Sequence, residues 1–126
     1  MTNFEEDLLR NYDYVEDIMS RVSNQAAILQ MSGYFKESIE VYERKSDYLG
    51  KSHASQEIMD KYHLEVADAY RLSDDYKKAL DEYSKIATPT MKLIAEIHIA
   101  ELYHQSKDSA KFNNIISSLE PKIPEL

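Results

Sequence analysis

The chain has 126 residues, of which 43% are hydrophobic and 30% are charged, a composition typical of folded rather than disordered proteins. Its 23 acidic and 15 basic side chains give a net charge of −8, which makes a nucleic acid an unfavourable partner because phosphates would be repelled. The absence of cysteine excludes disulfides and thiolate metal sites. We therefore expect one globular domain, residues 1–126, that binds no nucleic acid.

Two features of the residue order bear on location. The first ten residues, MTNFEEDLLR, are acidic and lack the basic-then-apolar order of a secretory signal. No apolar run approaches the roughly 18 residues that a membrane-spanning helix needs. A cytoplasmic protein without a membrane partner is the expectation.

Glycine and proline are scarce, with two and three copies, so the chain has few sites for the tight turns of a many-stranded sheet. No segment alternates apolar and polar residues with a period of two. The sequence therefore predicts an all-α protein without a sheet.

The first helix is predicted to begin at a capping box, in which the Thr2 side chain accepts from the Glu5 amide and Glu5 reaches back to the Thr2 amide. Apolar residues on one helical face follow at Phe4, Leu8, Val15, Met19, Val22, Ala26 and Leu29. Gly33 is expected to end the run in a left-handed conformation. Residues 1–18 are predicted to form an acidic N-terminal helix that caps the fold. Whether Ser23 and Asn24 divide the run into two helices stays open.

A second helix is predicted from about Tyr34 to Leu49, with Gly50 as its end. Its inward side chains are expected to be Ile39, Tyr42 and Leu49.

The third helix is predicted to begin at a cap formed by Ser52 or Ser55. Its apolar face comprises Ile58, Tyr62, Val66, Ala69 and Tyr70. A fourth helix is expected to be capped by Ser73 or Asp74 and to reach about Ala87.

Thr88 followed by Pro89 predicts the start of a fifth helix, because proline at the first helical position loses no hydrogen bond. This helix is expected to run to about Ser106. Asp108 is the predicted cap of the last helix, which Pro121 ends. The chain would then contain six or seven helices, and consecutive helices would run antiparallel because the connectors are short.

The sequence also repeats itself. Ala67 and Tyr70 recur further along the chain as Ala100 and Tyr103. Tyr76, Ala79 and Tyr83 have earlier counterparts in Phe35, Ser38 and Tyr42, and later ones in Ser109, Phe112 and Ile116. A period of roughly 33 to 41 residues built from helix pairs is typical of a solenoid.

The small residues at these positions have a physical explanation. Ala67 and Ala79 fall on two consecutive predicted helices, and placing one against the other lets the two backbones approach closely. Flanking tyrosines would fill the space on either side. A large residue at either position would force the helices apart, at a cost of about 1–3 kcal/mol.

The stretch from Ala67 to Tyr83, AxxYxxxDxYxxAxxxY, resembles the tetratricopeptide repeat family, with Asp74 in place of the usual turn glycine. Residues 22–49 match more weakly, and residues 96–124 match with Phe112 in place of a small residue. The resemblance implies a short right-handed solenoid of stacked antiparallel helix pairs. Its repeats would be residues 19–51, 52–88 and 89–124.

In that family the first helix of each pair lines a concave groove that binds a peptide or a partner helix. Two rows with helical spacing fit such a groove here, offset from the packing face of Ala67 and Tyr70. The predicted site residues are Lys61, Leu64, Asp68 and Arg71 in one row, and Ile94, Ile97, Glu101, His104 and Gln105 in the other. Apolar anchors with convergent charges suit a protein or peptide segment. A solvated helix face is the alternative interpretation of both rows.

Several functional alternatives stay open. A self-associating structural subunit, with a homodimer through an incomplete end, is one of them; a secretion-type chaperone and a peptide-sensing regulator are others. One specialisation of the family holds a C-terminal carboxylate with asparagine and lysine. Asp68 and Glu101 occupy the asparagine positions and would repel that ligand.

Catalysis and cofactors find little support in the sequence. No nucleotide-binding glycine motif or nucleophile elbow is present, and GKS at Gly50–Ser52 lacks the first glycine of a phosphate loop. Two carboxylate–histidine pairs, Asp60 with His63 and Glu101 with His104, are predicted to lie on different faces. We expect a non-catalytic protein with no metal and no cofactor.

Overall fold

The structure of the protein, a computed structural model, describes residues 20–51 and 55–122. Within these two segments all regular structure is helical and no strand occurs, which confirms the all-α class for this part of the chain. The elements are a helix over residues 20–31, α2 (Phe35–Lys51), α3 (Gln56–Leu72), α4 (Tyr76–Tyr83), α5 (Pro89–Gln105), α6 (Ser109–Leu119) and the 3-10 turn η1 (Glu120–Lys122). The predicted acidic helix at residues 1–18, with its capping box at Thr2, lies outside the described residues.

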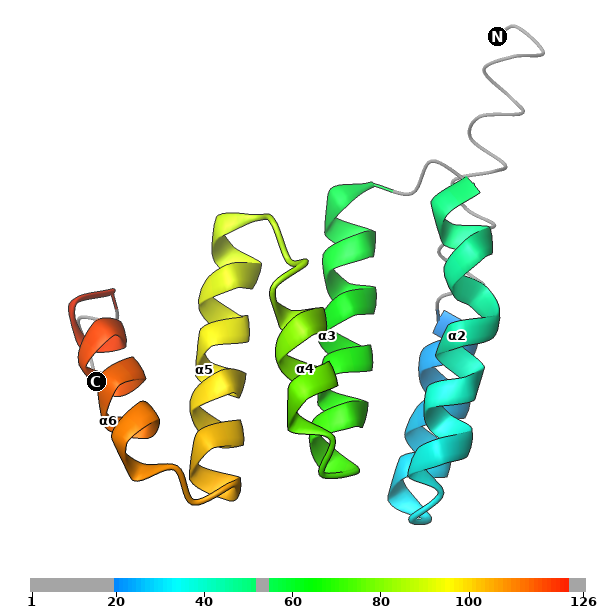
Figure 1. The fold of residues 1–126 in the computed structure, drawn as a ribbon. Coiled ribbons are helices and arrows are strands. Elements are labelled where there is room, and N and C mark those ends of the chain that lie inside the picture. Colours follow the sequence, from blue (N-terminus) through cyan, green and yellow to red (C-terminus); the bar gives the residue numbers. More distant parts are fainter. Residues whose placement is uncertain (1–19, 52–54, 123–126) are drawn as a thin grey trace, which may run out of the picture.

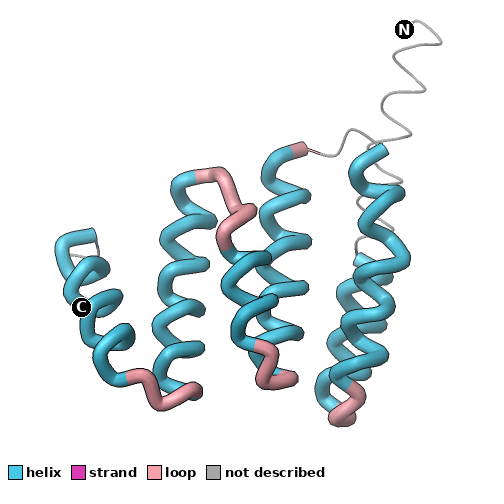
Figure 2. The backbone as a smooth tube through the Cα atoms, in the orientation of Figure 1, coloured by secondary structure: helices cyan, strands magenta, loops and turns pink. Residues whose placement is uncertain are grey.

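The helices stand side by side in a row, and consecutive helices run in opposite directions (Figures 1 and 2). Helix α3 contacts α2 and α4, and α5 contacts α6. Helix α5 also contacts both α3 and α4, so it lies against the two helices before it. The helix at residues 20–31 lies beside α2 at one end of the row, and α6 lies at the other end (Figure 1).

Three connecting turns share one backbone geometry. Gly33, Asp74 and Lys107 have positive φ angles of 83°, 66° and 63°. The amide after each of them donates to a carbonyl five residues earlier, as in a Schellman helix end: Tyr34 to Leu29 at 2.8 Å, Asp75 to Tyr70 at 2.9 Å and Asp108 to Tyr103 at 3.0 Å. The spacing of these three turns equals the two offsets of the sequence repeat, so the repeat reappears in the backbone.

The first two of these turns are further apart in the sequence than the last two, mainly because the helix after the first turn is longer than the helix after the second. Helix α2 has 17 residues whereas its counterpart α4 has eight. The prediction that Gly50 ends the second helix is wrong, because α2 continues through it to Lys51. A glycine inside a helix costs only about 1 kcal/mol. A single glycine near the end of a helix therefore does not have to terminate it.

Two predicted boundaries of the fourth helix are also wrong. The N-cap is Asp75 and not Ser73 or Asp74, because Asp74 takes the left-handed turn position and the Asp75 carboxylate accepts from the Lys78 amide at 3.3 Å. The helix ends at Tyr83 and not near Ala87. The Ala87 amide is withdrawn from the helix by a hydrogen bond to Asp60 at 3.0 Å.

Three other predicted helix starts are confirmed. Ser55 caps α3 by accepting from the Ile58 amide at 3.3 Å, and Asp108 caps α6 by accepting from the Lys111 amide at 3.2 Å. Thr88 is the N-cap of α5, with proline following it at the start of the helix. Residues 20–31 form one continuous helix, so Ser23 and Asn24 do not divide it.

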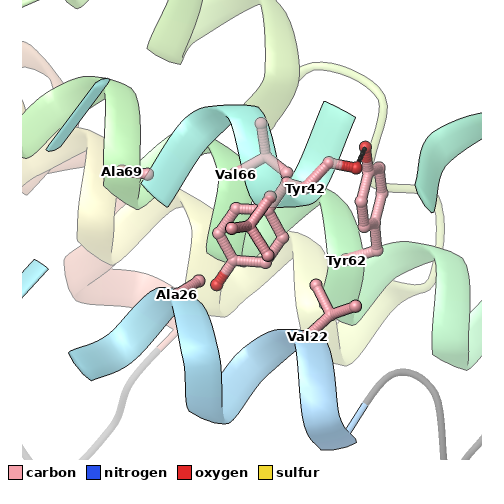
Figure 3. Packing of buried hydrophobic residues seen from close by; sticks show 7 residues of the cluster. Val22, Ala26, Tyr42, Tyr62, Val66 and Ala69 are labelled. Carbon is pink, nitrogen blue, oxygen red and sulfur yellow. Dashed lines mark hydrogen bonds between the residues drawn. The ribbon is translucent and has the colours of Figure 1, made fainter. Parts of the chain in front are cut away.

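One hydrophobic cluster joins the helix at residues 20–31 to α2 and α3 (Figure 3). Its buried members are Val22, Ala26, Val41, Tyr42, Tyr62, Val66 and Ala69. The Tyr62 hydroxyl donates to the Tyr42 carbonyl at 3.1 Å, and the two rings meet edge to face with centroids 6.1 Å apart. Buried Ser38 donates to the carbonyl of Ala26 at 3.1 Å, so this small residue lies where the helix at residues 20–31 meets α2.

A second cluster joins α3, α4 and α5. Ala67 and Ala79 are both 0% exposed and belong to this cluster, as the small-residue crossing predicts. Its other buried members are Tyr83, Ile86, Ala95 and Leu102. The apolar core therefore continues from α3 and α4 onto α5.

A buried carboxylate holds the start of α5 against α3. Asp60 is fully buried and accepts from the amides of Ala87 and Thr88 at 3.0 and 2.9 Å, and from the Thr88 hydroxyl at 2.6 Å. Gln56 donates a fourth hydrogen bond at 2.8 Å. Burial alone would raise the pKa of Asp60, but the hydrogen bonds from Thr88 and its neighbours lower the pKa to about 2.

Candidate binding site at the α5–α6 end

The structure brings the ends of the two predicted rows together, because α3 contacts α5. Arg71, in the α3 row, lies 3.7 Å from the Glu101 carboxylate, and its Nη1 donates to the Gln105 side chain at 3.3 Å. Both partners belong to the α5 row. The two rows are therefore neighbours in space, although they lie on helices that α4 separates in the sequence.

The α3 row is largely engaged in holding α3, α4 and α5 together. Asp68 accepts from the Tyr83 hydroxyl of α4 at 2.5 Å and from His98 Nδ1 of α5 at 2.8 Å. Leu64 is partly buried and packs against the second cluster, whereas Lys61 is exposed. Most of this row therefore has partners within the chain.

These contacts shift two pKa values. Burial, followed by the hydrogen bond to the Asp68 carboxylate, raises the pKa of the Tyr83 hydroxyl. The hydrogen bond to Asp68 raises the pKa of His98. The Asp68 carboxylate thus stabilises the protonated forms of Tyr83 and His98 and connects α3, α4 and α5. We call this set of contacts around Asp68 the joint.

Arg71 is enclosed in the same joint. Its side chain is 15% exposed, and its Nε lies 3.7 Å from Asp68 without making a hydrogen bond. Gln105 crosses from α5 to donate to the Arg71 carbonyl at 3.1 Å, to Asp74 at 3.1 Å and to the Tyr76 hydroxyl at 3.2 Å. Substitution of Arg71 would therefore disturb the α3–α5 contact as well as any binding surface.

The α5 row is more open than the α3 row. Ile97 is 37% exposed, the Glu101 side chain is 57% exposed, and His104 and Gln105 are exposed, while Ile94 is partly buried. Five of the nine predicted site residues line one open cavity of about 510 Å³, which we call the α5–α6 cavity. Its lining is Arg71, Ile97, Ala100, Glu101, His104, Gln105, Phe112 and Ile116. The other four predicted residues, Lys61, Leu64, Asp68 and Ile94, do not line it.

Sequence reasoning missed the contribution of α6. Phe112 and Ile116 form the α6 side of the cavity, and the Phe112 ring lies 5.5 Å from the His104 ring between centroids. A signal was present, because Phe112 stands one repeat after Ala79, where the repeat calls for a small side chain. Phe112 lines the cavity together with Ala100, the counterpart of Ala67.

Two further cavities are smaller. One of about 330 Å³ is lined by Lys36, Ile39, Glu40, Glu43, Tyr70, Ser73, Asp75 and Lys78. Its polar groups meet one another: the Tyr70 hydroxyl donates to Glu43 at 3.2 Å, and Lys78 Nζ lies 5.7 Å from the centre of the Tyr70 ring. The other, of about 230 Å³, lies between α4 and α5 and is lined by Leu80, Tyr83, Ser84, Ile86, Lys92, Ala95, Glu96 and Ile99.

Of the two carboxylate–histidine pairs considered in the sequence, the members of the first make separate contacts within the chain. Asp60 is occupied by Thr88 and Ala87, and His63 meets Glu82 at 2.9 Å. No group of three or more histidine and carboxylate side chains that could hold a metal ion occurs in residues 20–51 and 55–122. In the same segments, no helix is both long enough and apolar enough to cross a membrane.

Comparison of the chain with protein-family models, with curated proteins and with solved structures finds no match.

Proposed function

We propose that the protein is a non-catalytic adaptor or regulator that binds a protein or peptide segment at the α5–α6 cavity. The observation that carries this proposal is the cavity itself, in which apolar side chains from two helices lie beside a charged rim. Ile97, Phe112 and Ile116 can bury an apolar side chain of a ligand, while Glu101 can fix the orientation of a polar group. Such a site suits recognition of a chain segment.

A tetratricopeptide-like solenoid is the architecture that we propose for this adaptor. Three observations support it: the three left-handed turns, the burial of the small residues at repeat positions, and the packing of α5 against both α3 and α4. In such an array each pair contacts only its neighbours. Among the described residues, α2, which would belong to the first pair, makes no backbone contact with α5 or α6, which would form the third.

The position of the site differs from a groove that runs along both predicted rows. Asp68 and Arg71 are engaged with α4 and α5, so the α3 row offers less free surface. The open part is the α5 row together with α6. The proposed ligand therefore contacts the last pair of helices, with Arg71 at the edge of the site.

Selection of peptides tests this proposal. A displayed library of random linear peptides is selected on the intact protein, and the selected peptides are titrated against an Ile97→Asp/Ile116→Asp variant. The matched control is Ile28→Asp, because Ile28 is an exposed isoleucine at the other end of the row. Peptides should lose binding to the double variant and keep binding to the control. Equal binding to both variants, with unchanged circular dichroism, would contradict the proposed site.

Self-association within a larger assembly is a second candidate function. Large apolar side chains are exposed on, or directly after, the helix at residues 20–31, which lies at the opposite end of the row from α6 (Figure 1): Ile28, Met31 and Tyr34. Exposed apolar clusters mark interaction surfaces. Light scattering over a wide range of protein concentration tests this role, and a mass that stays at one chain throughout would exclude it.

A further inference from the structure

The surface that lines the α5–α6 cavity corresponds to a surface that is covered by a helix one repeat earlier in the chain. Helix α5 contacts α3 and α4, and it shares the second cluster or a polar contact with these residues of the two helices: Leu64, Ala67, Asp68, Arg71, Ala79 and Tyr83. Moved along the chain by the offset that relates Ala67 to Ala100, these positions become Ile97, Ala100, Glu101, His104, Phe112 and Ile116. All six counterparts line the cavity. The cavity therefore lies on the surface where a further helix equivalent to α5 would pack.

The exposure of the side chains supports this correspondence. Asp68 is 22% exposed whereas its counterpart Glu101 is 57% exposed. Tyr83 is buried, whereas its counterpart Ile116 is only partly buried. Arg71 is mostly buried, whereas its counterpart His104 is exposed. The same kind of surface is thus covered by a helix in one repeat and open in the next.

The contacts of α5 show what such an occupant offers. Ala95 and Leu102 of α5 enter the apolar cluster, and His98 between them donates to Asp68 at 2.8 Å. These residues lie three and four positions apart, which places them on one face of a helix. The matching ligand is therefore a helix with an apolar face and, at its centre, a side chain that can donate to a carboxylate, as a cationic group does.

Charge favours a different protein over a second copy of this chain as the source of that helix. Glu101 occupies the place of Asp68, so a cation of the occupant would lie where His98 lies in the covered repeat. The net charge of −8 attracts a basic segment and opposes close approach of an identical chain.

We propose that the α5–α6 cavity binds an amphipathic α-helix of a partner protein that carries a cationic side chain at the centre of its apolar face, in the manner in which α5 packs on α3 and α4. The inference rests on the proposed binding function and adds the class of partner. The apolar face of the helix packs on Ile97, Phe112 and Ile116, and its central cation pairs with Glu101. Binding through such a face is a common mode of helix recognition.

The sequence of α5 supplies the probe. A fluorescein-labelled, N-acetylated peptide of residues 89–105 carries His98→Lys, which makes its central cation permanent. The matched control peptide carries His98→Glu. Both are titrated against the intact protein by fluorescence anisotropy, and against a Glu101→Lys variant, whose fold is checked by circular dichroism; the Glu101 side chain is 57% exposed.

The expected result is binding of the lysine peptide, about tenfold weaker binding of the glutamate peptide, and reversal of this preference in the Glu101→Lys variant. Absence of binding by the lysine peptide, or an identical preference in both proteins, overturns the proposal. If selected library peptides still bind through Ile97 and Ile116, only the class of partner is wrong. If no peptide binds there, the proposed function fails as well.

Self-association is the remaining outcome. Sedimentation velocity of the protein alone should show one species across the concentrations used for the titration. A dimer that dissociates in the Ile116→Asp variant would show that a second copy occupies the surface, which also overturns the proposal.

Discussion

His98 Nδ1 of α5 lies 2.8 Å from Asp68 Oδ1 of α3, and the same carboxylate oxygen accepts from the Tyr83 hydroxyl of α4 at 2.5 Å. One acidic side chain thus connects three helices and two successive helix pairs. Arg71 of α3 and Glu101 of α5 also act on His98 electrostatically. This joint positions α5, and with it one wall of the α5–α6 cavity.

Stability should depend on pH through His98. Because its hydrogen bond to Asp68 raises the pKa of His98 in the folded protein, the extra stability is complete below the ordinary pKa of about 6.5 and is lost as the pH rises through the folded value. Urea unfolding at pH 6 and pH 8 should show this loss, on the order of 0.5–1 kcal/mol for a partly exposed pair. His98→Gln should remove it, whereas exposed His104→Gln should not. An unchanged pH dependence in His98→Gln would contradict the role of the joint.

Asp60 should contribute strongly to stability. Asp60→Asn replaces an acceptor of four hydrogen bonds with an amide that can accept only some of them, so we expect a loss of about 2–3 kcal/mol in the free energy of unfolding. Asp81→Asn is the matched control, because Asp81 is exposed and its contact with Lys85 is 3.8 Å long. That change should cost less than about 0.5 kcal/mol.

The contribution of Asp60 to the free energy of unfolding should be lost in acid. The pKa of Asp60 is lowered to about 2 in the folded state, so its stabilising effect is complete above the ordinary value near 4 and is lost as the pH falls toward 2. Urea unfolding of the parent protein and Asp60→Asn should therefore differ at pH 5 and converge toward pH 2. A constant difference over this range would show that the carboxylate is not ionised in the folded protein.

At one of the left-handed turns, a substitution should increase the stability of the protein. Lys107 holds a φ of 63°, which is unfavourable for a side chain with a Cβ, so Lys107→Gly should raise the free energy of unfolding by up to about 1 kcal/mol. Lys107→Ala keeps the strain and serves as the control. Gly33→Ala should destabilise by about 1 kcal/mol through backbone strain alone, since an added Cβ meets no atom within 4 Å. Thermal unfolding measures all three changes.

The helix crossing at Ala79 should tolerate no larger side chain. Ala79 is 0% exposed, so Ala79→Leu is expected to lower the free energy of unfolding by about 2–3 kcal/mol through overpacking. Ala110→Leu, at an exposed position of α6, is the control and should be nearly neutral. An Ala79→Leu protein as stable as its parent would mean that the two helices do not meet closely at this position.

For the part of the chain that the structure describes, local features of the sequence were sufficient to predict the presence of the helices, most of their N-caps and the spacing of the turns. Ala67 and Ala79 are buried in one cluster, as expected of positions reserved for small side chains. These predictions depend on residues within a few positions of one another, or on a repeat that is visible in the chain.

The remaining features depend on contacts between distant residues. Asp68 meets His98 across 30 positions, so the periodicity of α3 alone could not distinguish an open row from a joint. The end of α4 could not be placed because Asp60, 27 positions earlier, takes the Ala87 amide. Phe112 was recognised as a departure from the repeat, but its place in the cavity follows only from the packing of α6 on α5.

Amide chemical-shift mapping with the lysine form of the α5 peptide tests the central claim most directly. The account predicts that the perturbed resonances concentrate in residues 97–116, on α5 and α6, with little change in α2. Perturbation centred on α2 or on the first half of α3, with α6 unaffected, would show that the open surface beside Phe112 is not the binding site.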